Sequence, residues 1–435
     1  MAGNDDRHRI VIVGGGVAGL EMASALSRQW KRRGRHPSVT LVDREWAHVW
    51  KPMLHTIAAG TRDISQQQTP YIAQGRHVGF SFQPGELNGI DRTAREIRLA
   101  AMHAPDGRLL IPERGLAYDT LVLALGSQAN DFGTPGVAAH CRRIDSREQA
   151  TAFNQEVRLR ILQCLAQDSS LSIGIVGGGA TGVELAAELV QLAEFSVAYG
   201  ANDLASRLTI TLIESGPRLL PAFPEDISAA TRSRLEALGV NVVTGAHVEA
   251  VDNGGFVLGD GTRLETSLKV WAAGVKAAEF LSGFGGLESN RANQLLVGPS
   301  LQSTLDSNIY ALGDCASLTL LGAERPLPPT AQIAHQQALH LIRHLPEAIL
   351  RGKAIPAFQP RDMGALVSLG DYDAFGSLGK FGFFKGTTIR GRLAQFGHVM
   401  LYRSHQARLH GVWRGSLLWF VDLLNARLRA PIRLD

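Results

Sequence analysis

The sequence has few cysteines and no long apolar run, and each absence excludes a class of protein. Only three of its 435 residues are cysteine, Cys141, Cys164 and Cys315, and no two of them are neighbours. The lack of a CxxC or CxC pair argues against a disulfide scaffold, a cysteine-ligated metal site and a redox-active dithiol. Apolar runs stay short of the ~20 residues that a membrane-spanning helix needs, and the polar, acidic start predicts no signal peptide.

Acidic residues are scarce near the C-terminus, so the charge is unevenly distributed. From position 380 onward the chain holds ten Lys and Arg against two acidic residues, a net +8, which leaves −4 for the rest of a chain whose total is +4. A basic tail on an acidic body indicates an anionic surface as partner. We expect a membrane and no nucleic acid, because the basic residues alternate with Trp, Leu and Phe at helical spacing.

A strand, a glycine turn and a helix occur twice in the chain. The stretch RIVIVGGGVAGLEMASAL covers residues 9–26 and SIGIVGGGATGVELAAEL covers 172–189, with glycine matching glycine at an offset of 163 residues. The short β-branched runs Arg9–Val13 and Ser172–Val176 predict buried parallel strands. A helical pattern follows each turn, so each stretch predicts a strand, a tight turn and a helix.

Each turn has the pattern GxGxxG, and each is followed by a strand that ends in an acidic residue, Asp43 or Glu214. The first glycine permits the tight turn, the second lets the backbone approach a pyrophosphate, and the third lets helix pack on strand. The helix N-terminus offers N–H groups to the phosphates, and the acid accepts hydrogen bonds from a ribose. Two such units predict two bound dinucleotides, which is how a flavin meets a mobile nicotinamide. The glycines are Gly14, Gly16 and Gly19, then Gly177, Gly179 and Gly182.

With these two units the sequence resembles the two-dinucleotide flavoprotein oxidoreductases, and specifically the type II NADH dehydrogenases, which are single-subunit, non-proton-pumping NADH:quinone oxidoreductases. The resemblance covers nearly the whole chain. Besides the two glycine turns, it includes VTLVDREWAHVWKPMLHTIAAGT, YDTLVLALGS, ITLIESGPRLLPAF, VWAAGV, NIYALGDCASL, PPTAQIAHQQA, RDMGALVSLGDYDAFG and LYRSHQARLHGVWRG.

The resemblance implies that the first turn holds FAD, with Asp43 on its ribose. Lys51 lies in a segment that approaches the flavin, and its KP stands where many members have QP. The segment ALGDCAS implies that Asp314 bonds the ribitol hydroxyl, with a turn or helix cap as the alternative role, and that Cys315 is a small buried residue. The implied FAD contacts are Gly14, Gly16, Val17, Ala18, Gly19, Asp43, Lys51, Gly126, Gly313, Asp314, Ala331 and Gln332.

The second turn is implied to hold NADH. Glu214 would bond the ribose 2′-hydroxyl and repel a 2′-phosphate, which favours NADH over NADPH. Arg218 is expected to be a solvated loop residue, and the alternative is that it softens this preference. Glu184 is implied to lie beside the nicotinamide, and the alternative is a favourable acid at a helix N-terminus. The implied NAD contacts are Gly177, Gly179, Thr181, Gly182, Glu184, Glu214 and Gly274.

The segment AQIAHQQA, residues 331–338, is similar to the AQxAxQQ segment of the family and implies a quinone site. Ala331 and Gln332 would touch the pyrimidine side of the flavin. Gln332 and Gln336 are four residues apart and share a helical face, so they would line the quinone pocket, and with Glu184 they are the implied catalytic residues. Some members carry a lysine where Met363 stands, so the proton route to the quinone stays unassigned.

The tail has the pattern of an amphipathic helix with a continuous apolar stripe. We expect it to lie in the plane of an anionic membrane, on the cytoplasmic face of the inner membrane, as a peripheral attachment. The alternatives are packing on the body of the protein and a homodimer interface. The stripe comprises Trp413, Leu417, Phe420, Leu424 and Leu428, and the polar residues around it are Arg414, Asp422, Asn425, Arg427 and Arg429.

The expected fold is α/β, with two Rossmann-like dinucleotide-binding domains and a C-terminal membrane-anchoring region. An NAD domain, 141–275, is inserted into an FAD domain, 1–140 and 276–355, and residues 356–435 form the quinone and membrane region. The expected activity is NADH oxidation through FAD to a quinone. The alternatives are a sulfide:quinone oxidoreductase, which needs cysteines beside the flavin, and a non-catalytic nucleotide sensor. No metal site is expected, because only His340 and His344 share a helical face and no carboxylate joins them.

Overall fold

The computed structural model describes residues 7–33, 37–62, 68–196, 203–377 and 388–428. The chain divides into two compact units. The first unit comprises Met1–Trp50, Gln68–Gln128 and Val275–Arg361, and the second comprises Lys51–Gln67, Ala129–Gly274 and Asp362–Asp435. The four segment boundaries expected from the sequence stay a prediction.

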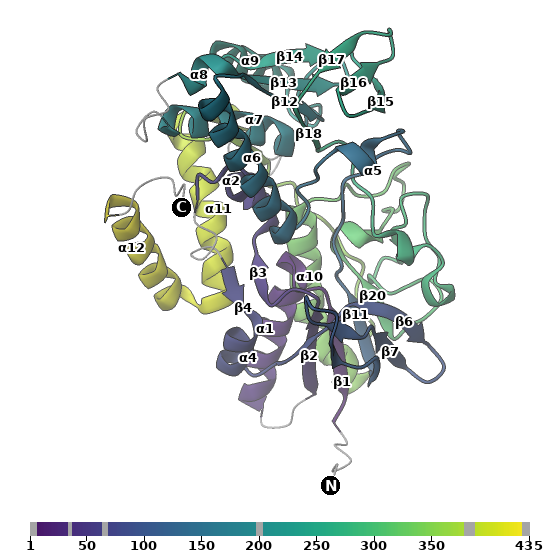
Figure 1. Ribbon diagram of the computed structural model, residues 1–435. Helices are drawn as coiled ribbons and strands as arrows, with labels where there is room; N and C mark the ends of the chain where they lie inside the picture. The colour runs from purple at the N-terminus through teal and green to yellow at the C-terminus, as the bar shows by residue number, and fades with distance from the viewer. Residues whose placement is uncertain (1–6, 34–36, 63–67, 197–202, 378–387, 429–435) are drawn as a thin grey trace. The chain divides into compact units, whose positions relative to one another are not determined.

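The first unit is built on a five-stranded parallel sheet with the strand order β20-β11-β1-β2-β5 (Figure 1). Its central strand is almost fully buried, as its β-branched sequence predicts. Helices α1 and α10 pack against each other beside this sheet. The elements are β1 (Arg9–Val13), α1 (Val17–Arg33), β2 (Ser38–Asp43), α4 (Tyr71–Val78), β5 (Ser81–Pro84), β11 (Thr120–Leu123), β20 (Ile309–Ala311) and α10 (Ala331–Arg351).

Smaller elements complete the first unit. An antiparallel sheet has the order β10-β7-β6, and three two-stranded pairs join β3 to β4, β8 to β9 and β19 to β21. The elements are β3 (Ala47–Val49), β4 (Gln68–Pro70), β6 (Leu87–Asp91), β7 (Glu96–Leu99), β8 (Met102–His103), β9 (Leu109–Ile111), β10 (Arg114–Ala117), η3 (Glu279–Leu281), η4 (Phe284–Gly286), β19 (Leu295–Leu296), η5 (Gly313–Cys315) and β21 (Ala316–Ser317).

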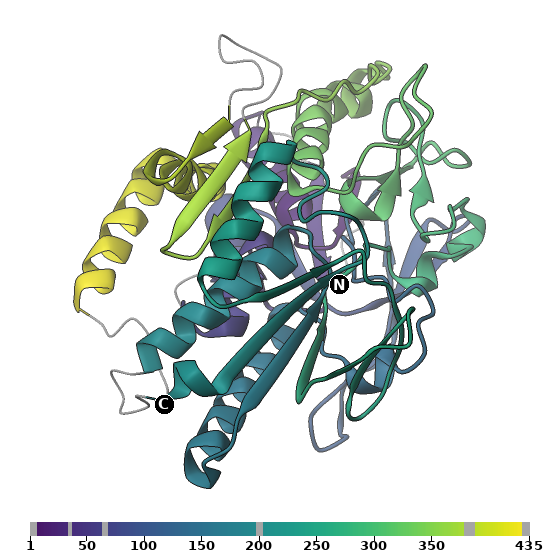
Figure 2. The same cartoon turned by 90° about the horizontal axis from the view of Figure 1, so that it is seen from above.

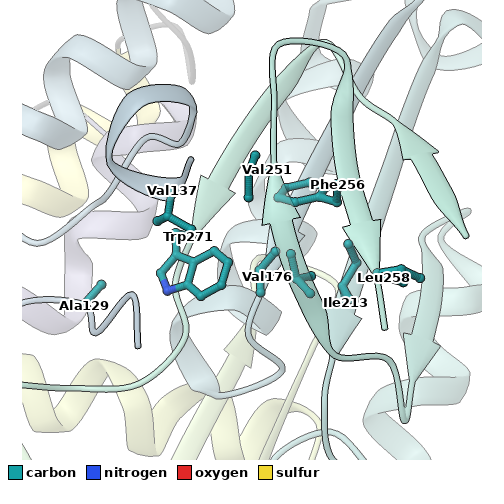
Figure 3. Close-up of a cluster of buried hydrophobic side chains, with 9 residues drawn as sticks. Ala129, Val137, Val176, Ile213, Val251, Phe256, Leu258 and Trp271 are labelled. Atoms are coloured by element: carbon teal, nitrogen blue, oxygen red, sulfur yellow. The ribbon is translucent and has the colours of Figure 1, made fainter. Parts of the chain in front are cut away.

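The second unit repeats the plan with a four-stranded parallel sheet in the order β14-β13-β12-β18. An antiparallel sheet, β15-β16-β17, belongs to the same unit, and Figure 3 shows the apolar cluster in which Phe256 and Trp271 take part. The elements are α6 (Arg147–Gln167), β12 (Leu171–Val176), α7 (Ala180–Ser196), β13 (Leu208–Glu214), α9 (Glu225–Ala237), β14 (Asn241–Thr244), β15 (Val248–Val251), β16 (Gly255–Leu258), β17 (Arg263–Glu265) and β18 (Leu268–Trp271).

The second unit also contains a short N-terminal helical segment and the C-terminal region. The antiparallel sheet β22-β23-β24 packs on α11, and α12 lies beside α11 in both views (Figures 1 and 2). The elements are η1 (Lys51–Met53), α2 (Leu54–Ala59), α5 (Val137–His140), α8 (Leu204–Arg207), β22 (Ala365–Leu369), β23 (Asp373–Ser377), β24 (Thr388–Arg390), α11 (Arg392–His410) and α12 (Val412–Leu428).

The predicted repeat and fold class are confirmed. Both predicted strands are present, and the acids Asp43 and Glu214 end β2 and β13 as expected. Each helix begins directly after its glycine turn, at Val17 and at Ala180, and α1 therefore starts three residues before the apolar pattern that revealed it. No helix in the described ranges has the length and apolar character that crossing a membrane requires.

Candidate functional site

The first glycine turn can be formed only by glycine at two of its three positions. Gly14 has φ +102, and a Cβ there would lie 2.3 Å from the carbonyl oxygen of Ala124. A Cβ on Gly19 would lie 1.8 Å from the carbonyl oxygen of Gly14, the residue that directly follows β1. Gly16 differs, because a Cβ there would meet no protein atom within 4 Å. The space at Gly16 is therefore open, as a pyrophosphate requires of the second glycine.

The second turn reproduces this geometry residue by residue. Gly177 has φ +116 and lies against the backbone of Ala272, with its Cβ position 2.8 Å from that carbonyl carbon. A Cβ on Gly182 would lie 2.0 Å from the carbonyl oxygen of Gly177, whereas one on Gly179 would meet nothing within 4 Å. Each unit thus carries a turn with two steric glycines and one open position, and both turns fit a dinucleotide pyrophosphate.

The helix N-termini supply the donors for each turn. The first intrahelical bond of α1 runs from the nitrogen of Leu20 to the oxygen of Gly16, and that of α7 runs from Val183 to Gly179. The N–H groups of the three residues between each of these pairs have no acceptor within their own helix. They carry the positive end of the helix dipole toward the open glycine. The predicted contacts Val17, Ala18, Gly19, Thr181 and Gly182 all lie in these two stretches.

The carboxylates of Asp43 and Glu214 each accept a hydrogen bond from the backbone of a glycine turn. Oδ2 of Asp43 accepts a hydrogen bond from the backbone N–H of Gly15 at 2.5 Å, and Oδ1 accepts one from Glu45 at 2.8 Å. Oε2 of Glu214 accepts from Gly178 at 2.7 Å, in the equivalent place. Burial raises the pKa of Asp43, and the two N–H groups oppose that rise. The remaining lone pairs of both carboxylates are fixed in direction and suit a ribose hydroxyl.

Arg218 is partly buried, and its guanidinium is bonded to the loop in which it lies. Its guanidinium donates to the backbone oxygens of Phe223 at 2.9 Å, Pro221 at 2.9 Å and Leu220 at 3.3 Å. These three bonds close the loop that follows Glu214. The sequence-based expectation for Arg218 is therefore corrected: the residue stabilises the loop by hydrogen bonds. The sequence could not predict these bonds, because the acceptors are backbone atoms.

The segment after β20 positions Asp314 through residues that the sequence reasoning missed. Oδ2 of Asp314 accepts the hydroxyl proton of Ser127 at 2.7 Å, and its backbone oxygen accepts from Gln294 at 2.9 Å. Gly313, with φ +71, donates its N–H to Oε1 of the buried Gln337 at 2.7 Å. The glutamine pair QQ in AQIAHQQA was the available signal for Gln337, but only Gln336 was assigned a role.

Helix α10 begins with the expected free donors. Thr330 caps it, with its hydroxyl oxygen accepting from the N–H of Ile333 at 3.2 Å. The N–H groups of Ala331 and Gln332 lie in the first turn and have no intrahelical acceptor, so they suit the polar edge of a flavin. The amide of Gln336 is bonded twice to the backbone of Arg361, at 2.7 and 2.8 Å. Gln336 thus connects α10 to the chain that follows it, and the place of Gln332 and Gln336 beside a quinone stays a prediction.

Glu184 is buried in the first part of α7. Its Oε1 accepts from the backbone N–H of Ser368 at 3.0 Å, and its Oε2 lies 3.4 Å from Nδ1 of His55. Burial raises the pKa of Glu184 to about 8, and burial lowers that of His55 to about 3. The contact therefore joins two neutral groups at pH 7. His55 and Ser368 are far from Glu184 in sequence, so spacing could not reveal them.

The remaining predicted contacts lie in turns of the two units. Gly126 has φ +70 and open space at its Cβ position, as a close approach requires. Gly274 has φ +65, and a Cβ there would lie 2.4 Å from the ring of Phe132. A larger residue at position 274 would therefore clash with Phe132. Lys51 begins η1 and belongs to the second unit. Its place beside a flavin stays a prediction.

No metal cluster and no disulfide is found among the described residues. His340 and His344 are neighbours on α10, with ring centroids 4.8 Å apart, and Nε2 of His340 lies 2.9 Å from the backbone oxygen of Pro356. His335 instead contacts the buried Glu21 of α1 at 2.5 Å. Cys315 is buried, as expected, and burial raises the pKa of its thiol to about 11.

The predicted C-terminal helix is present as α12, and its exposed apolar residues include the predicted stripe together with Val412, Leu418, Val421 and Leu423. Arg403 of α11 donates to Oδ2 of Asp422 at 2.5 Å and lies over the ring of Trp419, so the polar edge of α12 faces its own unit. The side chain of Arg427 and residue Arg429 lie outside the described residues. The stripe is exposed by 43 to 85%: Trp413, Leu417, Phe420, Leu424 and Leu428.

Two dinucleotide cradles on two parallel sheets define the class of the protein as a two-nucleotide oxidoreductase fold. The pyridine nucleotide-disulphide oxidoreductase family model matches residues 8–338. A type II NADH:quinone oxidoreductase of Haemophilus influenzae is 40% identical over 444 residues, covering 98% of this chain and 99% of the relative. One from Staphylococcus aureus strain NCTC 8325 is 29% identical over 401 residues, covering 90% and 93%. The chain belongs to the pyridine nucleotide-disulphide oxidoreductase family and, within it, to the type II NADH:quinone oxidoreductases.

Solved structures agree on the fold. NDH2 from Plasmodium falciparum in complex with NADH has a TM-score of 0.82 at 21% identity, with 99% of this chain and 100% of that chain covered. The sulfide:quinone oxidoreductase of Aquifex aeolicus has a TM-score of 0.70 at 17% identity, with 97% and 95% covered. At these identities the likeness establishes the fold alone. It does not decide between NADH:quinone and sulfide:quinone chemistry, which depends on the residues of the site.

Proposed function

We propose that the chain oxidises NADH by hydride transfer to a bound FAD and passes two electrons to a membrane quinone without pumping protons. The observation that carries the proposal is the pair of equivalent cradles, each with one open glycine, one set of free helix N–H groups and one fixed acid. Family membership supports the reaction, since the relatives of known name are NADH:quinone oxidoreductases.

The first cradle would hold FAD. The N–H groups after Gly16 would bind its pyrophosphate, Asp43 its ribose and Asp314 its ribitol chain, while the start of α10 would face the pyrimidine carbonyls. FAD, when bound, accepts a hydride and releases electrons to the quinone. The donors at Ala331 and Gln332 favour negative charge on the reduced ring because a helix N-terminus carries partial positive charge.

The second cradle would hold NADH. Glu214 would accept from the 2′-hydroxyl of its ribose and repel a 2′-phosphate. Arg218 does not offset that repulsion, because its guanidinium is occupied by three backbone oxygens. Glu184 would lie on the side of α7 that faces the nicotinamide. Because its pKa is raised to about 8, its carboxyl group would be protonated at pH 7 and could donate a hydrogen bond there. The chain contributes proximity and orientation to this step and supplies no nucleophile.

The outward stripe of α12 would attach the protein to an anionic membrane, on the cytoplasmic face of the inner membrane. Fully burying one such side chain is worth roughly 1.5–3 kcal/mol, and each nearby arginine adds about 1 kcal/mol at an anionic surface. On α11, Leu393, Phe396 and Leu401 are exposed as well. The attachment would be peripheral, and a homodimer interface is the alternative occupant of this surface.

A sulfide:quinone activity finds no support in the thiols. Cys315 lies in the first unit beside the backbone oxygens of Leu123 and Leu312, at 3.4 Å from each, and its raised pKa keeps it a thiol. Burial raises the pKa of Cys141 to about 12 as well. Sulfur redox chemistry at a cysteine proceeds through its thiolate, and neither Cys141 nor Cys315 is poised to form one.

The test uses purified protein and two half-reactions. We expect a yellow protein that bleaches with NADH and recovers its colour with a short-chain quinone, with NADPH and sulfide far less effective. A colourless protein would indicate the sensor instead, and bleaching by sulfide would indicate the other oxidoreductase.

A further inference from the structure

The backbone oxygen of Gly15, in the middle of the first glycine turn, lies within hydrogen-bond distance of two buried side chains. The hydroxyl of Tyr71 donates to it at 3.0 Å, and Nδ1 of His48 lies 2.9 Å from it. A carbonyl oxygen can only accept, so Nδ1 of His48 carries the proton of this bond. Tyr71 is 2% exposed and His48 is 3% exposed. The turn is therefore held by two side-chain donors that are buried from solvent.

These bonds fix the direction of the N–H group at the open glycine. The peptide bond after Gly15 is planar and trans, so a fixed oxygen on Gly15 also fixes the N–H of Gly16 in the opposite direction. The N–H of Gly15 is fixed as well, because it donates to Oδ2 of Asp43 at 2.5 Å. Gly15 is buried, whereas Gly16 is exposed. The three bonds thus orient the exposed part of the turn from its buried side.

The two donors come from one small substructure of the first unit (Figure 1). Strand β3 pairs with β4, with His48 opposite Thr69, and α4 begins with Tyr71 directly after β4. The N–H of Tyr71 donates to the backbone oxygen of Trp46 at 3.0 Å, and its ring packs on that of Phe82 with the centroids 5.1 Å apart. The positions of the hydroxyl and the imidazole are therefore set by regular elements.

The ring of Tyr71 also explains why position 15 is glycine, although the GxGxxG pattern permits any residue there. A Cβ on Gly15 would lie 2.4 Å from Cζ and from Oη of Tyr71. The φ of Gly15 is not positive, so the backbone conformation does not require glycine at this position. The close approach of the Tyr71 ring excludes a side chain, and that approach brings the hydroxyl to the oxygen of Gly15.

The second glycine turn has a different partner for the equivalent oxygen. Among the described residues, the donor to the oxygen of Gly178 is the backbone N–H of Leu220, at 2.8 Å. Leu220 lies in the loop after β13, part of which is exposed, whereas His48 and Tyr71 are buried residues of a strand and a helix. Exposed loops open locally at a lower free energy than buried elements. We therefore expect the second turn to be held less rigidly than the first.

We propose that Tyr71 and His48 hold the first glycine turn in its nucleotide-binding shape before the nucleotide arrives, and that this makes the first nucleotide a resident cofactor while the second exchanges. The inference rests on the proposed function, which assigns FAD to the first cradle and NADH to the second. A site that is already ordered binds more tightly, because binding does not have to order it. Tyr71 and His48 are positioning residues, since they act on the nucleotide through the backbone of Gly15.

The test measures the dissociation constant of FAD with the full-length chain. Protein freed of flavin is titrated with FAD, and the quenching of flavin fluorescence reports binding. In Tyr71→Phe, which keeps the ring and loses the hydroxyl, we expect Kd for FAD to rise about tenfold, the effect of one lost hydrogen bond. KM for NADH should stay within about twofold of the wild-type value when the variant is saturated with FAD.

The imidazole is tested by a pair of variants. His48→Leu removes the donor and should raise Kd for FAD about tenfold. His48→Asn should restore tight binding, because its amide nitrogen can take the place of Nδ1. In the double variant of Tyr71→Phe and His48→Leu the oxygen of Gly15 loses both donors. Its Kd should rise at least about a hundredfold, and FAD should be lost during gel filtration.

Tyr310→Phe is the matched control. This buried tyrosine lies in the same unit, and its hydroxyl accepts a hydrogen bond from Gln302 at 3.2 Å. Its loss should lower the thermal midpoint of the flavin-free protein but leave Kd for FAD unchanged. The same result in Tyr71→Phe would show that Tyr71 only stabilises the fold. Circular dichroism shows which variants fold, and Tyr71→Phe with His48→Asn decides the matter if the others do not.

Equal dissociation constants for FAD in the wild type and in folded Tyr71→Phe and His48→Leu would overturn the inference. A rise in KM for NADH as large as the rise in Kd for FAD would overturn the contrast between the two cradles. A wild-type protein that binds no FAD would overturn the proposed function instead.

Discussion

Oε2 of Glu214 lies 2.7 Å from the backbone nitrogen of Gly178, so the carboxylate that would bind the nucleotide ribose also holds the turn that would bind its phosphates. Replacing Glu214 by glutamine removes the negative charge that repels a 2′-phosphate and keeps a group of the same shape. We expect kcat/KM for NADPH to rise about tenfold and that for NADH to fall by a similar factor, the size of one charged hydrogen bond. Steady-state rates with both nucleotides provide the check.

The control for this prediction is Arg218→Ala. Because Arg218 braces its loop through three backbone oxygens, its loss should lower the thermal midpoint and raise KM for NADH and NADPH alike. A selective change in NADPH use by Arg218→Ala would contradict the geometry.

The two open glycines allow the cradles to be told apart. In Gly16→Ala the new methyl group meets no protein atom, so the chain should fold, but it occupies the space expected for the FAD pyrophosphate. We expect a folded protein with little bound flavin, measured by the absorbance ratio of flavin to protein. Gly179→Ala should retain its flavin and raise KM for NADH by about tenfold or more, a cost of at least 1.4 kcal/mol.

Gly19→Ala is the steric counterpart of this pair. Its methyl group would lie 1.8 Å from the oxygen of Gly14, so the protein should misfold or lose stability whether or not FAD is present. If Gly16→Ala bound FAD as tightly as the wild type, or if Gly179→Ala lost its flavin, the assignment of the cofactors to the cradles would be wrong.

The repeated unit was predictable because every feature of it is local. A β-branched strand, three glycines and an acid such as Asp43 can all be recognised within about 35 residues of sequence. The structure places them as expected. The partners of Glu184, Arg218 and Asp314 were not predictable, because they are backbone atoms or side chains brought in from distant segments. A bond from Ser368 to Glu184 spans 184 positions and leaves no periodicity to detect.

The exposed stripe of α12 predicts membrane binding that depends on apolar side chains. Replacing Leu417, Phe420 and Leu424 together by glutamine should reduce co-sedimentation with anionic vesicles at least tenfold, because each loses an apolar anchor. NADH oxidation with a water-soluble acceptor should be unchanged, since these residues are exposed and α12 stays held by the bond between Arg403 and Asp422.

The matched control replaces Leu159 and Leu162, which are exposed to a similar extent on α6. Glutamine at these positions should leave vesicle binding as it is. If both triple and double variants bound vesicles like the wild type, but the triple variant changed from dimer to monomer, the stripe would be a homodimer interface.

The buried carboxyl group of Glu188 predicts how stability depends on pH. Its pKa is raised in the folded state from an ordinary 4.5 to about 7, so the folded state holds its proton more tightly than the unfolded state. This contribution to stability is fully present below about pH 4.5 and is lost as the pH rises through about 7. In Glu188→Gln, which cannot ionise, that loss should disappear. The difference between variant and wild type should therefore grow by up to about 3 kcal/mol between pH 4.5 and 8 in favour of the variant. Urea midpoints of the FAD-loaded protein at several pH values measure it, and parallel curves for the two proteins would show that Glu188 ionises in the folded state as it does in water.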